Sequence, residues 1–256
     1  MIAPVMVPLS TIPSVTAARM AEVDRLAIES YGITLLQMME QAGSHLAEVA
    51  RLELGGDLVG RSIVVAVGPG NNGGGGLVAA RHLANRGARV RVILARPALR
   101  MTEAARHQLA TLLAMGTSCC VATYDLPDEE LASELASADL IIDAILGYNI
   151  DGPPHGEVAR LIGWLLRTDR PILSLDVPSG LDPDTGSAAA AATVIASATL
   201  TLALPKPGLL GASGAAHAGR LYVADLGLPD ALYHDLGIAV GPLFAGSRIV
   251  KVDPAR

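Results

Sequence analysis

Short apolar runs alternate with helix-like segments along most of this chain, and this alternation restricts the fold more than any other feature. Strands are expected at residues 62–67, 90–94, 119–122, 139–143, 171–175, 199–204 and 220–224. Helices are expected between them, at residues 77–86, 102–115, 128–137 and 157–167. Strands that alternate with helices favour right-handed crossovers and a parallel sheet. We therefore expect an α/β fold with a Rossmann-like, doubly wound, mostly parallel sheet and helices on both faces, a three-layer α/β/α arrangement.

The composition fits a sheet that is buried on both faces. Hydrophobic residues make up 51% of the 256 residues and aromatic residues only 3%, so we expect an aliphatic core. No linker-like stretch divides the chain, which predicts one domain over residues 16–256 after an N-terminal arm over residues 1–15. Two helices should open the domain, the first capped by Thr16 and the second by a Thr34–Gln37 capping box.

Charge, cysteine content and hydropathy exclude several classes of partner. The net charge of −6 argues against non-specific nucleic-acid binding, because nothing offsets phosphate repulsion. Cys119 and Cys120 are adjacent, which favours a reducing compartment over a disulfide framework. The longest apolar run, residues 188–204, is short and contains hydroxyl side chains, so it predicts a helix followed by a buried strand rather than a membrane span. We expect a cytoplasmic protein that binds neither nucleic acid nor membrane.

A glycine-rich segment follows the first predicted strand of the alternating part. It reads Gly68-Pro69-Gly70-Asn71-Asn72-Gly73-Gly74-Gly75-Gly76 and precedes a predicted helix. Without side chains, backbone N–H groups can approach a phosphate, and the positive end of the helix adds to the attraction. Close packing of the helix on the strand is the simpler alternative. Four consecutive glycines exceed what a turn needs, so the pattern favours a phosphate-bearing ligand.

Two further strands end in a carboxylate. Asp143 and Asp176 follow apolar runs, and the carboxyl ends of parallel strands meet at the edge where open α/β sheets bind ligands. A turn or a helix cap would explain either aspartate alone. Two of them at equivalent strand ends, with Asn72 and Ser179 nearby, favour an oxygen-rich cation site or a pair of carboxylates that divides acid–base and electrostatic roles.

Other polar residues give weaker signals. The six histidines show no metal-ligand spacing, which argues against a zinc or iron site. Lys206 lies between two prolines at a strand end, where a phosphate contact and a surface or structural role are about equally supported.

Several motifs occur together and in order over roughly residues 16–229. They are Met39-Glu40-Gln41-Ala42-Gly43, Gly68-Pro69-Gly70-Asn71-Asn72-Gly73-Gly74, Leu77-Val78-Ala79-Ala80-Arg81-His82-Leu83, Asp176-Val177-Pro178-Ser179-Gly180-Leu181-Asp182, Asp184-Thr185-Gly186, Leu202-Ala203-Leu204-Pro205-Lys206 and Leu226-Gly227-Leu228-Pro229. In these segments the chain resembles the YjeF N-terminal family, the NAD(P)H-hydrate epimerases. The combination is specific to that family.

The resemblance implies an isomerase that repairs hydrated nicotinamide nucleotides by interconverting the R and S forms of NADHX and NADPHX at carbon 6 of the ring. It implies a potassium ion held by Asn72, Asp143 and Ser179. It also implies a homodimer and a functional partnership with a separate ADP/ATP-dependent NAD(P)H-hydrate dehydratase. The implied substrate contacts are Asn71, Asn72, Gly73, Gly74, Gly75, Gly147, Tyr148, Asn149, Ile150, Asp151, Gly152, Pro153 and Asp176. Asp176 is our candidate acid–base residue, because of its strand-end position.

Two positions depart from the family pattern and leave two alternatives open. Gly75 stands where the family usually has an aspartate, and Asp151 stands where it often has a basic residue. A nucleotide-binding module that has lost or changed catalysis is therefore a second interpretation. An NADP-dependent oxidoreductase is a third, because Arg96 follows the second strand of the alternating part, where a 2′-phosphate partner is expected.

Overall fold

The computed structural model describes residues 4–121, 125–150, 152–189 and 192–253, which contain one nine-stranded sheet. Its strand order is β1-β9-β8-β7-β6-β5-β2-β3-β4, and of these neighbouring strands only β8 and β9 pair antiparallel. The predicted mostly parallel, doubly wound sheet is thus confirmed. The strands are β1 (Val5–Pro8), β2 (Ser62–Val67), β3 (Arg89–Leu94), β4 (Ser118–Val121), β5 (Leu140–Ala144), β6 (Ile172–Leu175), β7 (Ala198–Leu202), β8 (Arg220–Ala224) and β9 (Ile249–Asp253).

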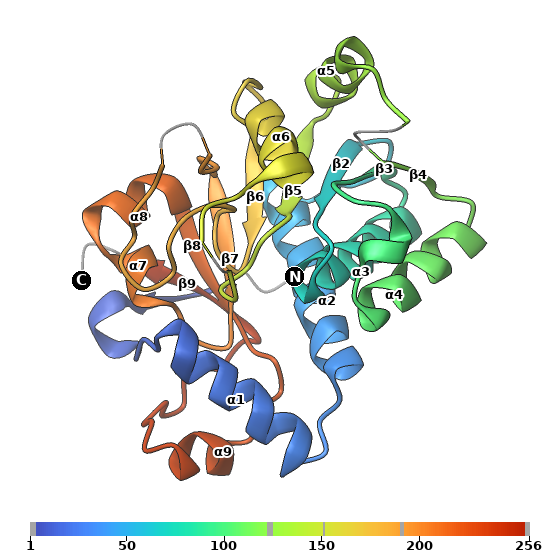
Figure 1. The fold of residues 1–256 in the computed structure, drawn as a ribbon. Coiled ribbons are helices and arrows are strands. Elements are labelled where there is room, and N and C mark those ends of the chain that lie inside the picture. The colour runs from blue at the N-terminus through green and yellow to red at the C-terminus, as the bar shows by residue number, and fades with distance from the viewer. Residues whose placement is uncertain (1–3, 122–124, 151, 190–191, 254–256) are drawn as a thin grey trace.

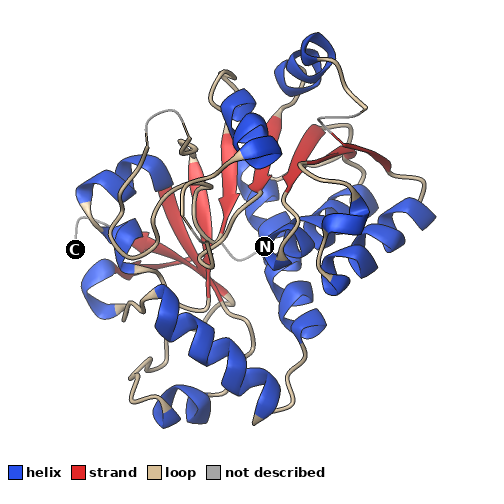
Figure 2. Cartoon of the chain, viewed as in Figure 1, coloured by secondary structure: helices blue, strands red, loops and turns tan. Residues whose placement is uncertain are grey.

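Helices cover both faces of the sheet (Figures 1 and 2). One face packs against α2, α3 and α4, and the other against α5, α6 and the short helices α7 and α8. Helices α1 and α9 contact each other and lie together at the bottom of Figure 1. The helices are α1 (Ala17–Glu29), α2 (Leu35–Glu53), α3 (Asn71–Asn85), α4 (Glu103–Ala114), α5 (Asp128–Ala136), α6 (Gly156–Leu165), α7 (Pro207–Leu210), α8 (Ala212–Ala218) and α9 (Asp230–Asp235), with 3₁₀ turns η1 (Leu9–Thr11) and η2 (Ala98–Arg100).

Alternation along the central strands supplies both sides of the core. In β2, Val65 packs into the cluster under α2, α3 and α4, whereas its neighbour Val64 packs into the cluster under α5 and α6. Successive strand residues point to opposite faces, so a strand that is apolar throughout must be covered twice. This explains why the aliphatic composition predicted three layers.

The first two helices begin where their caps were expected. The Thr16 hydroxyl accepts a hydrogen bond from the backbone N–H of Arg19 at 3.3 Å. Thr34 and Gln37 form the full capping box, in which each side chain accepts from the backbone N–H of the other residue. Met38, Met39, Ala42 and Leu46 of α2 are buried, so this helix presents an apolar stripe to the core.

The glycine-rich segment is not a loop throughout, contrary to our expectation. Helix α3 begins at Asn71, six residues before the predicted start, and Gly73–Gly76 form part of its first two turns and are buried. A methyl group at Gly74 would come within 2.7 Å of the Met39 side chain, and one at Gly76 would collide with Ala144. Close packing of α3 on α2 and β5 therefore explains glycine at these two positions.

Two other parts of the chain differ from the sequence expectations. The described residues of 188–197 contain no helix, so that prediction was wrong. Their backbone bonds to other segments instead, with the Val194 N–H donating to the Ser179 carbonyl at 2.9 Å. Residues 5–8 of the expected N-terminal arm form β1, which pairs with the unpredicted C-terminal strand β9. Within the described residues, no helix has both the length and the apolarity that a membrane span requires.

Candidate active site

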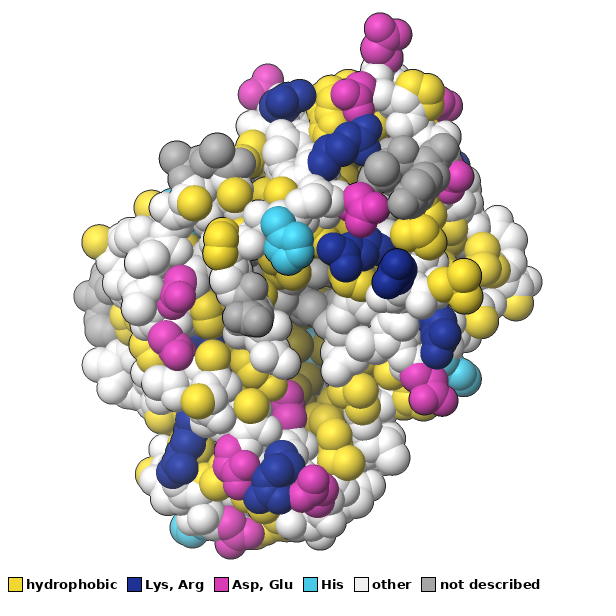
Figure 3. All heavy atoms as spheres, in the orientation of Figure 1, with side chains coloured by type: hydrophobic (Ala, Val, Ile, Leu, Met, Phe, Trp, Pro, Cys, Tyr) yellow, Lys and Arg dark blue, Asp and Glu magenta, His cyan; other side chains and the backbone are white. Residues whose placement is uncertain are grey.

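A cavity of about 410 Å³ opens where the order of the sheet reverses. Strand β2 has β3 and β4 on one side and β5 on the other, and their connections diverge above the carboxyl ends of the strands. Such a switch point is the usual ligand site of an open α/β sheet. Residues from α1, α2, the start of α3 and the segments after β2, β5, β6 and β7 line the cavity. The space-filling view shows this face of the molecule hollowed near its middle (Figure 3).

Asp176 lies directly after β6, lines the cavity and is only 2% exposed. One carboxylate oxygen forms an ion pair with the ammonium of Lys206, and the other accepts the backbone N–H of Tyr148 at 2.8 Å. Asp176 has a φ of +70°, in the left-handed region that few residues other than glycine adopt. Backbone strain of this kind costs about 1–3 kcal/mol and concentrates at functional sites. The backbone conformation and two donors thus fix this carboxylate at the cavity wall.

Lys206 is the lysine that the sequence left undecided, and it is fully buried. Besides the ion pair, its ammonium donates to the Leu202 carbonyl at 3.1 Å and lies 5.4 Å from the centre of the Tyr148 ring. Ala203, between β7 and Lys206, also has a positive φ, of +60°. The turn after β7 therefore directs the lysine toward the end of β6, and the surface role is excluded.

Asp143 lies within β5, and none of its surface is exposed. Its carboxylate accepts hydrogen bonds from the Ser174 hydroxyl at 2.8 Å, the Ser179 hydroxyl at 2.5 Å and the Ser179 N–H at 2.9 Å. The Ile145 N–H donates to it as well, at 3.3 Å. Burial raises the pKa of Asp143, and these four donors oppose that effect. Unlike Asp176, Asp143 is not among the residues that line the cavity.

Asn72 connects this carboxylate cluster to the cavity. Its side-chain amide donates to the carbonyls of Leu146 at 2.9 Å and Leu175 at 3.3 Å. The Leu146 N–H donates in turn to the Ser179 hydroxyl at 2.9 Å. Asn72, Asp143 and Ser179, predicted together from three separate segments, thus converge around the segment that follows β5. Among the described residues, no group of three or more His, Cys, Asp or Glu side chains is placed to hold a metal.

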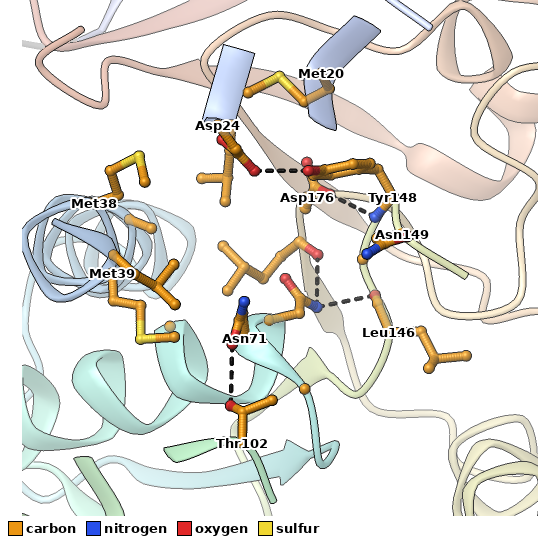
Figure 4. Close-up of a pocket in the computed structure, with 18 of the residues that line it drawn as sticks. Met20, Asp24, Met38, Met39, Asn71, Thr102, Leu146, Tyr148, Asn149 and Asp176 are labelled. Atoms are coloured by element: carbon orange, nitrogen blue, oxygen red, sulfur yellow. Dashed lines mark hydrogen bonds between the residues drawn. The ribbon is translucent and has the colours of Figure 1, made fainter. Parts of the chain in front are cut away.

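The amino end of α3 faces the cavity through Gly70, Asn71 and Asn72. N–H groups in the first turn of a helix have no partner within the helix, so this end is suited to an anion. The Thr102 hydroxyl donates to the Asn71 side chain at 3.0 Å and fixes it beside the cavity (Figure 4).

The other predicted substrate contacts divide into those that line the cavity and those that do not. Gly75, Gly147, Tyr148 and Asn149 line it together with Asn71, Asn72 and Asp176, whereas Gly73, Gly74, Ile150, Gly152 and Pro153 are not among the lining residues. Asp151 lies outside the described residues. Substrate roles for all of these positions stay predictions. Arg96, considered above as a 2′-phosphate partner, forms an ion pair with Glu157 at 3.2 Å.

Sequence reasoning missed Asp24. This residue of α1 lines the cavity, and its carboxylate accepts the Tyr148 hydroxyl at 2.6 Å. The helical pattern placed Asp24 between the buried Met20, Val23 and Ala27, so the only available signal was a carboxylate adjoining the apolar stripe of an amphipathic helix.

A parallel α/β fold with a helix amino end and buried carboxylates beside a switch-point cavity is an arrangement typical of nucleotide-binding proteins. Comparison with known proteins narrows this class. The family described as YjeF-related protein N-terminus matches residues 35–208. An NAD(P)H-hydrate epimerase of Dehalogenimonas lykanthroporepellens is 42% identical, over 89% of this chain and 87% of its own length. The chain belongs to the YjeF N-terminal family.

Two further relatives extend this comparison. The bifunctional NAD(P)H-hydrate repair enzyme Nnr of Moorella thermoacetica is 40% identical over 85% of this chain, which spans only 41% of the longer relative. The crystal structure of the yeast protein YNL200c matches 94% of this chain and 100% of the yeast chain, with a TM-score of 0.79 and 27% identity. The shared fold therefore covers almost the whole molecule.

Proposed function

We propose that this chain is an NAD(P)H-hydrate epimerase, an isomerase that interconverts the R and S forms of NADHX and NADPHX. One observation carries the proposal beyond family membership. The Asp176–Lys206 pair and the amino end of α3 line the same cavity. A phosphate at that helix end and a hydrated nicotinamide ring at Asp176 fit one dinucleotide that spans the switch point.

The reaction needs a group that exchanges a proton with oxygen at carbon 6. Loss of the hydroxyl, driven by the lone pair of the ring nitrogen, gives a flat cation to which water can add from the other face. Asp176 is the residue we assign to this acid–base exchange, since its carboxylate faces the cavity and is held by Lys206 and the Tyr148 N–H. The Lys206 ammonium fixes the orientation of Asp176 and partly balances its charge.

The residues around Asp143 fit a potassium ion. They offer a carboxylate, a hydroxyl and an amide oxygen, which is the hard oxygen chemistry that such cations prefer. The buried Asp143 accepts its hydrogen bonds from serine hydroxyls and backbone N–H groups, which carry no charge, so a monovalent cation would balance its charge. Asn72, Asp143 and Ser179 would hold the ion, which would supply fixed positive charge where the segments after β2, β5 and β6 meet.

The wider setting of the reaction is also part of this proposal. The relatives named bifunctional NAD(P)H-hydrate repair enzymes are longer than this chain, and we infer a functional partnership with a separate ADP/ATP-dependent dehydratase. We infer a cytoplasmic location. Nicotinamide nucleotides occur there, and its reducing conditions keep cysteines such as Cys119 and Cys120 as free thiols. A homodimer stays a prediction from the family resemblance.

A binding module without catalysis is the second candidate, and Gly75 is the observation that favours it. Gly75 lines the cavity beside Leu175, so a family-type aspartate here would have pointed a carboxylate toward the site. Its absence removes one charged group. The cavity retains two other carboxylates, Asp176 and Asp24, which is why we prefer the epimerase.

A coupled assay separates the two candidates. Pure R-form NADHX is supplied with a dehydratase specific for the S form, and loss of NADHX is followed with and without this protein. An epimerase makes consumption of the R form complete, at a rate proportional to its concentration. A binding module leaves the rate at the spontaneous value, although nucleotide binding is detected by calorimetry.

A further inference from the structure

A second carboxylate, that of Asp24, lines the cavity, and it comes from a helix rather than from a loop at the end of a strand. Asp24 lies on α1, and Figure 4 shows it reaching toward the hydroxyl of Tyr148. The backbone N–H of the same Tyr148 donates to Asp176. One tyrosine therefore contacts both acidic residues, through its hydroxyl on one side and its backbone on the other.

The two carboxylates differ in the groups that hold them. Asp176 is held by an ammonium ion and a backbone N–H, one on each oxygen. Asp24 is held at one oxygen, which accepts a hydrogen bond from the neutral Tyr148 hydroxyl. Donors that fix a carboxylate favour its ionised form, whereas a carboxyl group in an apolar wall with few donors favours the protonated form. Asp24 is the better suited of the two to carry a proton.

The charges around Asp24 agree with this division. Burial among residues such as Met20 raises the pKa of Asp24, and the negative charge of Asp176 acts in the same direction. The Tyr148 hydrogen bond and the Lys206 charge lower it, but burial is the largest of these effects. Burial raises the pKa of Tyr233 of α9, and the negative charges of Asp225 and Asp24 add to this effect.

We propose that Asp24 is a second catalytic residue, the acid that protonates the departing C6 hydroxyl, while Asp176 acts on the opposite face of the ring. This inference rests on the proposed epimerase function. As the C6–O bond breaks, the lone pair of N1 forms a C6=N1 double bond, and the oxygen leaves as water with the proton of Asp24. Water then adds to C6 from the other face, N1 regains its electron pair, and Asp176 takes the proton that this water loses.

The protonation states return through solvent. Asp176 releases one proton to water and Asp24 takes one up from water, so the cycle is balanced. Tyr148 is a positioning residue in this scheme, because its hydroxyl orients the Asp24 carboxyl without exchanging a proton with substrate.

The test uses Asp24→Asn, Tyr148→Phe and, as a matched control, Glu22→Gln. Glu22 is a partly exposed carboxylate on the same helix that pairs with Arg25. The readout is the pH profile of kcat for R-form NADHX in the coupled assay, with NADH binding measured by calorimetry. Asp24→Asn should lower kcat by about 10²–10⁴-fold, the usual contribution of an acid–base group, and leave the Kd for NADH within about threefold.

The pH profile of kcat separates a catalytic role of Asp24 from a purely structural one, because a structural residue would leave the profile unchanged. Activity of the wild-type protein should fall as rising pH removes the Asp24 proton, and Asp24→Asn should abolish that dependence. The Tyr148 hydroxyl lowers the pKa of Asp24, so Tyr148→Phe should shift the alkaline limb to higher pH. If the wild type is active but kcat of Asp24→Asn is within threefold of the wild-type value, the inference about Asp24 is wrong. The same holds if the alkaline limb of the pH profile does not move in Tyr148→Phe. Neither result contradicts the proposed epimerase function. An inactive wild type overturns the proposed function itself.

Discussion

Asp143 and Asp176 occupy comparable places at the ends of neighbouring strands, and both are almost completely buried. Asp143 is surrounded by serine hydroxyls and backbone N–H groups and stands apart from the cavity. Asp176 is paired with a buried lysine and lines the cavity. Two aspartates at comparable strand ends thus differ in their surroundings. Asp143 is enclosed by neutral hydrogen-bond donors, whereas Asp176 faces a cavity and is paired with a charged lysine.

The partners, rather than the strand position, decide what each aspartate can do. A carboxylate whose oxygens are all engaged by neutral donors cannot easily reach a substrate, and it stabilises the loops that donate to it. A carboxylate that is held by an ammonium group and faces a cavity can exchange a proton with a bound molecule. These differences support the proposed roles: loop organisation and cation holding for Asp143, and acid–base exchange for Asp176.

Removing the lysine from the Asp176 site should produce the largest effect on stability. Lys206→Met leaves a buried carboxylate without its counter-ion, and breaking a buried pair in this way costs about 3–5 kcal/mol. Urea denaturation followed by circular dichroism measures the change. The double variant Asp176→Asn/Lys206→Met should recover most of the loss. A single variant as stable as the wild type would show that the pair contributes no net stabilisation.

A substitution at the Asp143 site should have a smaller effect. In Asp143→Asn one oxygen becomes an NH₂ group, and both oxygens now accept a backbone N–H, from Ile145 and Ser179. In either orientation of the amide, the new NH₂ group therefore faces a backbone N–H, and neither donor has an acceptor. We expect this to lower the free energy of unfolding by about 1–3 kcal/mol. The control is Asp139→Asn, at a partly exposed position one residue before β5. Equal unfolding free energies for the two variants would contradict the closed hydrogen-bond cluster.

Restoring the family carboxylate should have the smallest effect on stability. At Gly75 a Cβ would lie 2.8 Å from the end of the Leu175 side chain, which is flexible and can shift, so Gly75→Asp should cost about 1 kcal/mol. The new charge would lie near the residue that precedes Asp176. Activity equal to or above that of the wild type in the coupled assay would show that the family aspartate is compatible with this cavity. Complete loss of activity would show that the cavity depends on glycine here.

Much of the fold was predictable because it depends on local pattern. The apolar runs that became β2, β3, β5 and β6, and the capping residues Thr16 and Thr34, are short-range signals that tertiary contacts reinforced. The start of α3 was missed, because glycine has a low helix propensity and only contacts with Met39 and Ala144 show why it is needed there. Strands β1 and β9 were missed because their pairing joins the two ends of the chain.

The site was predictable where residues follow strands and unpredictable where distant elements meet. Parallel strand ends bring Asn72, Asp143, Asp176 and Ser179 to one edge, and this was expected from sheet topology alone. No sequence pattern indicates that Lys206 would be fully buried, or that α1 would bring Asp24 to Tyr148. Both arrangements depend on long-range packing, which spacing along the chain does not encode.

The most direct test of this account compares the wild type with Asp176→Asn in the coupled assay on R-form NADHX. We expect complete consumption by the wild type. For Asp176→Asn we expect a rate that is lower by about 10²–10⁴-fold, while NADH still binds and the fold is retained. An Asp176→Asn protein that consumes the R form as fast as the wild type would contradict the assignment of acid–base chemistry to the end of β6.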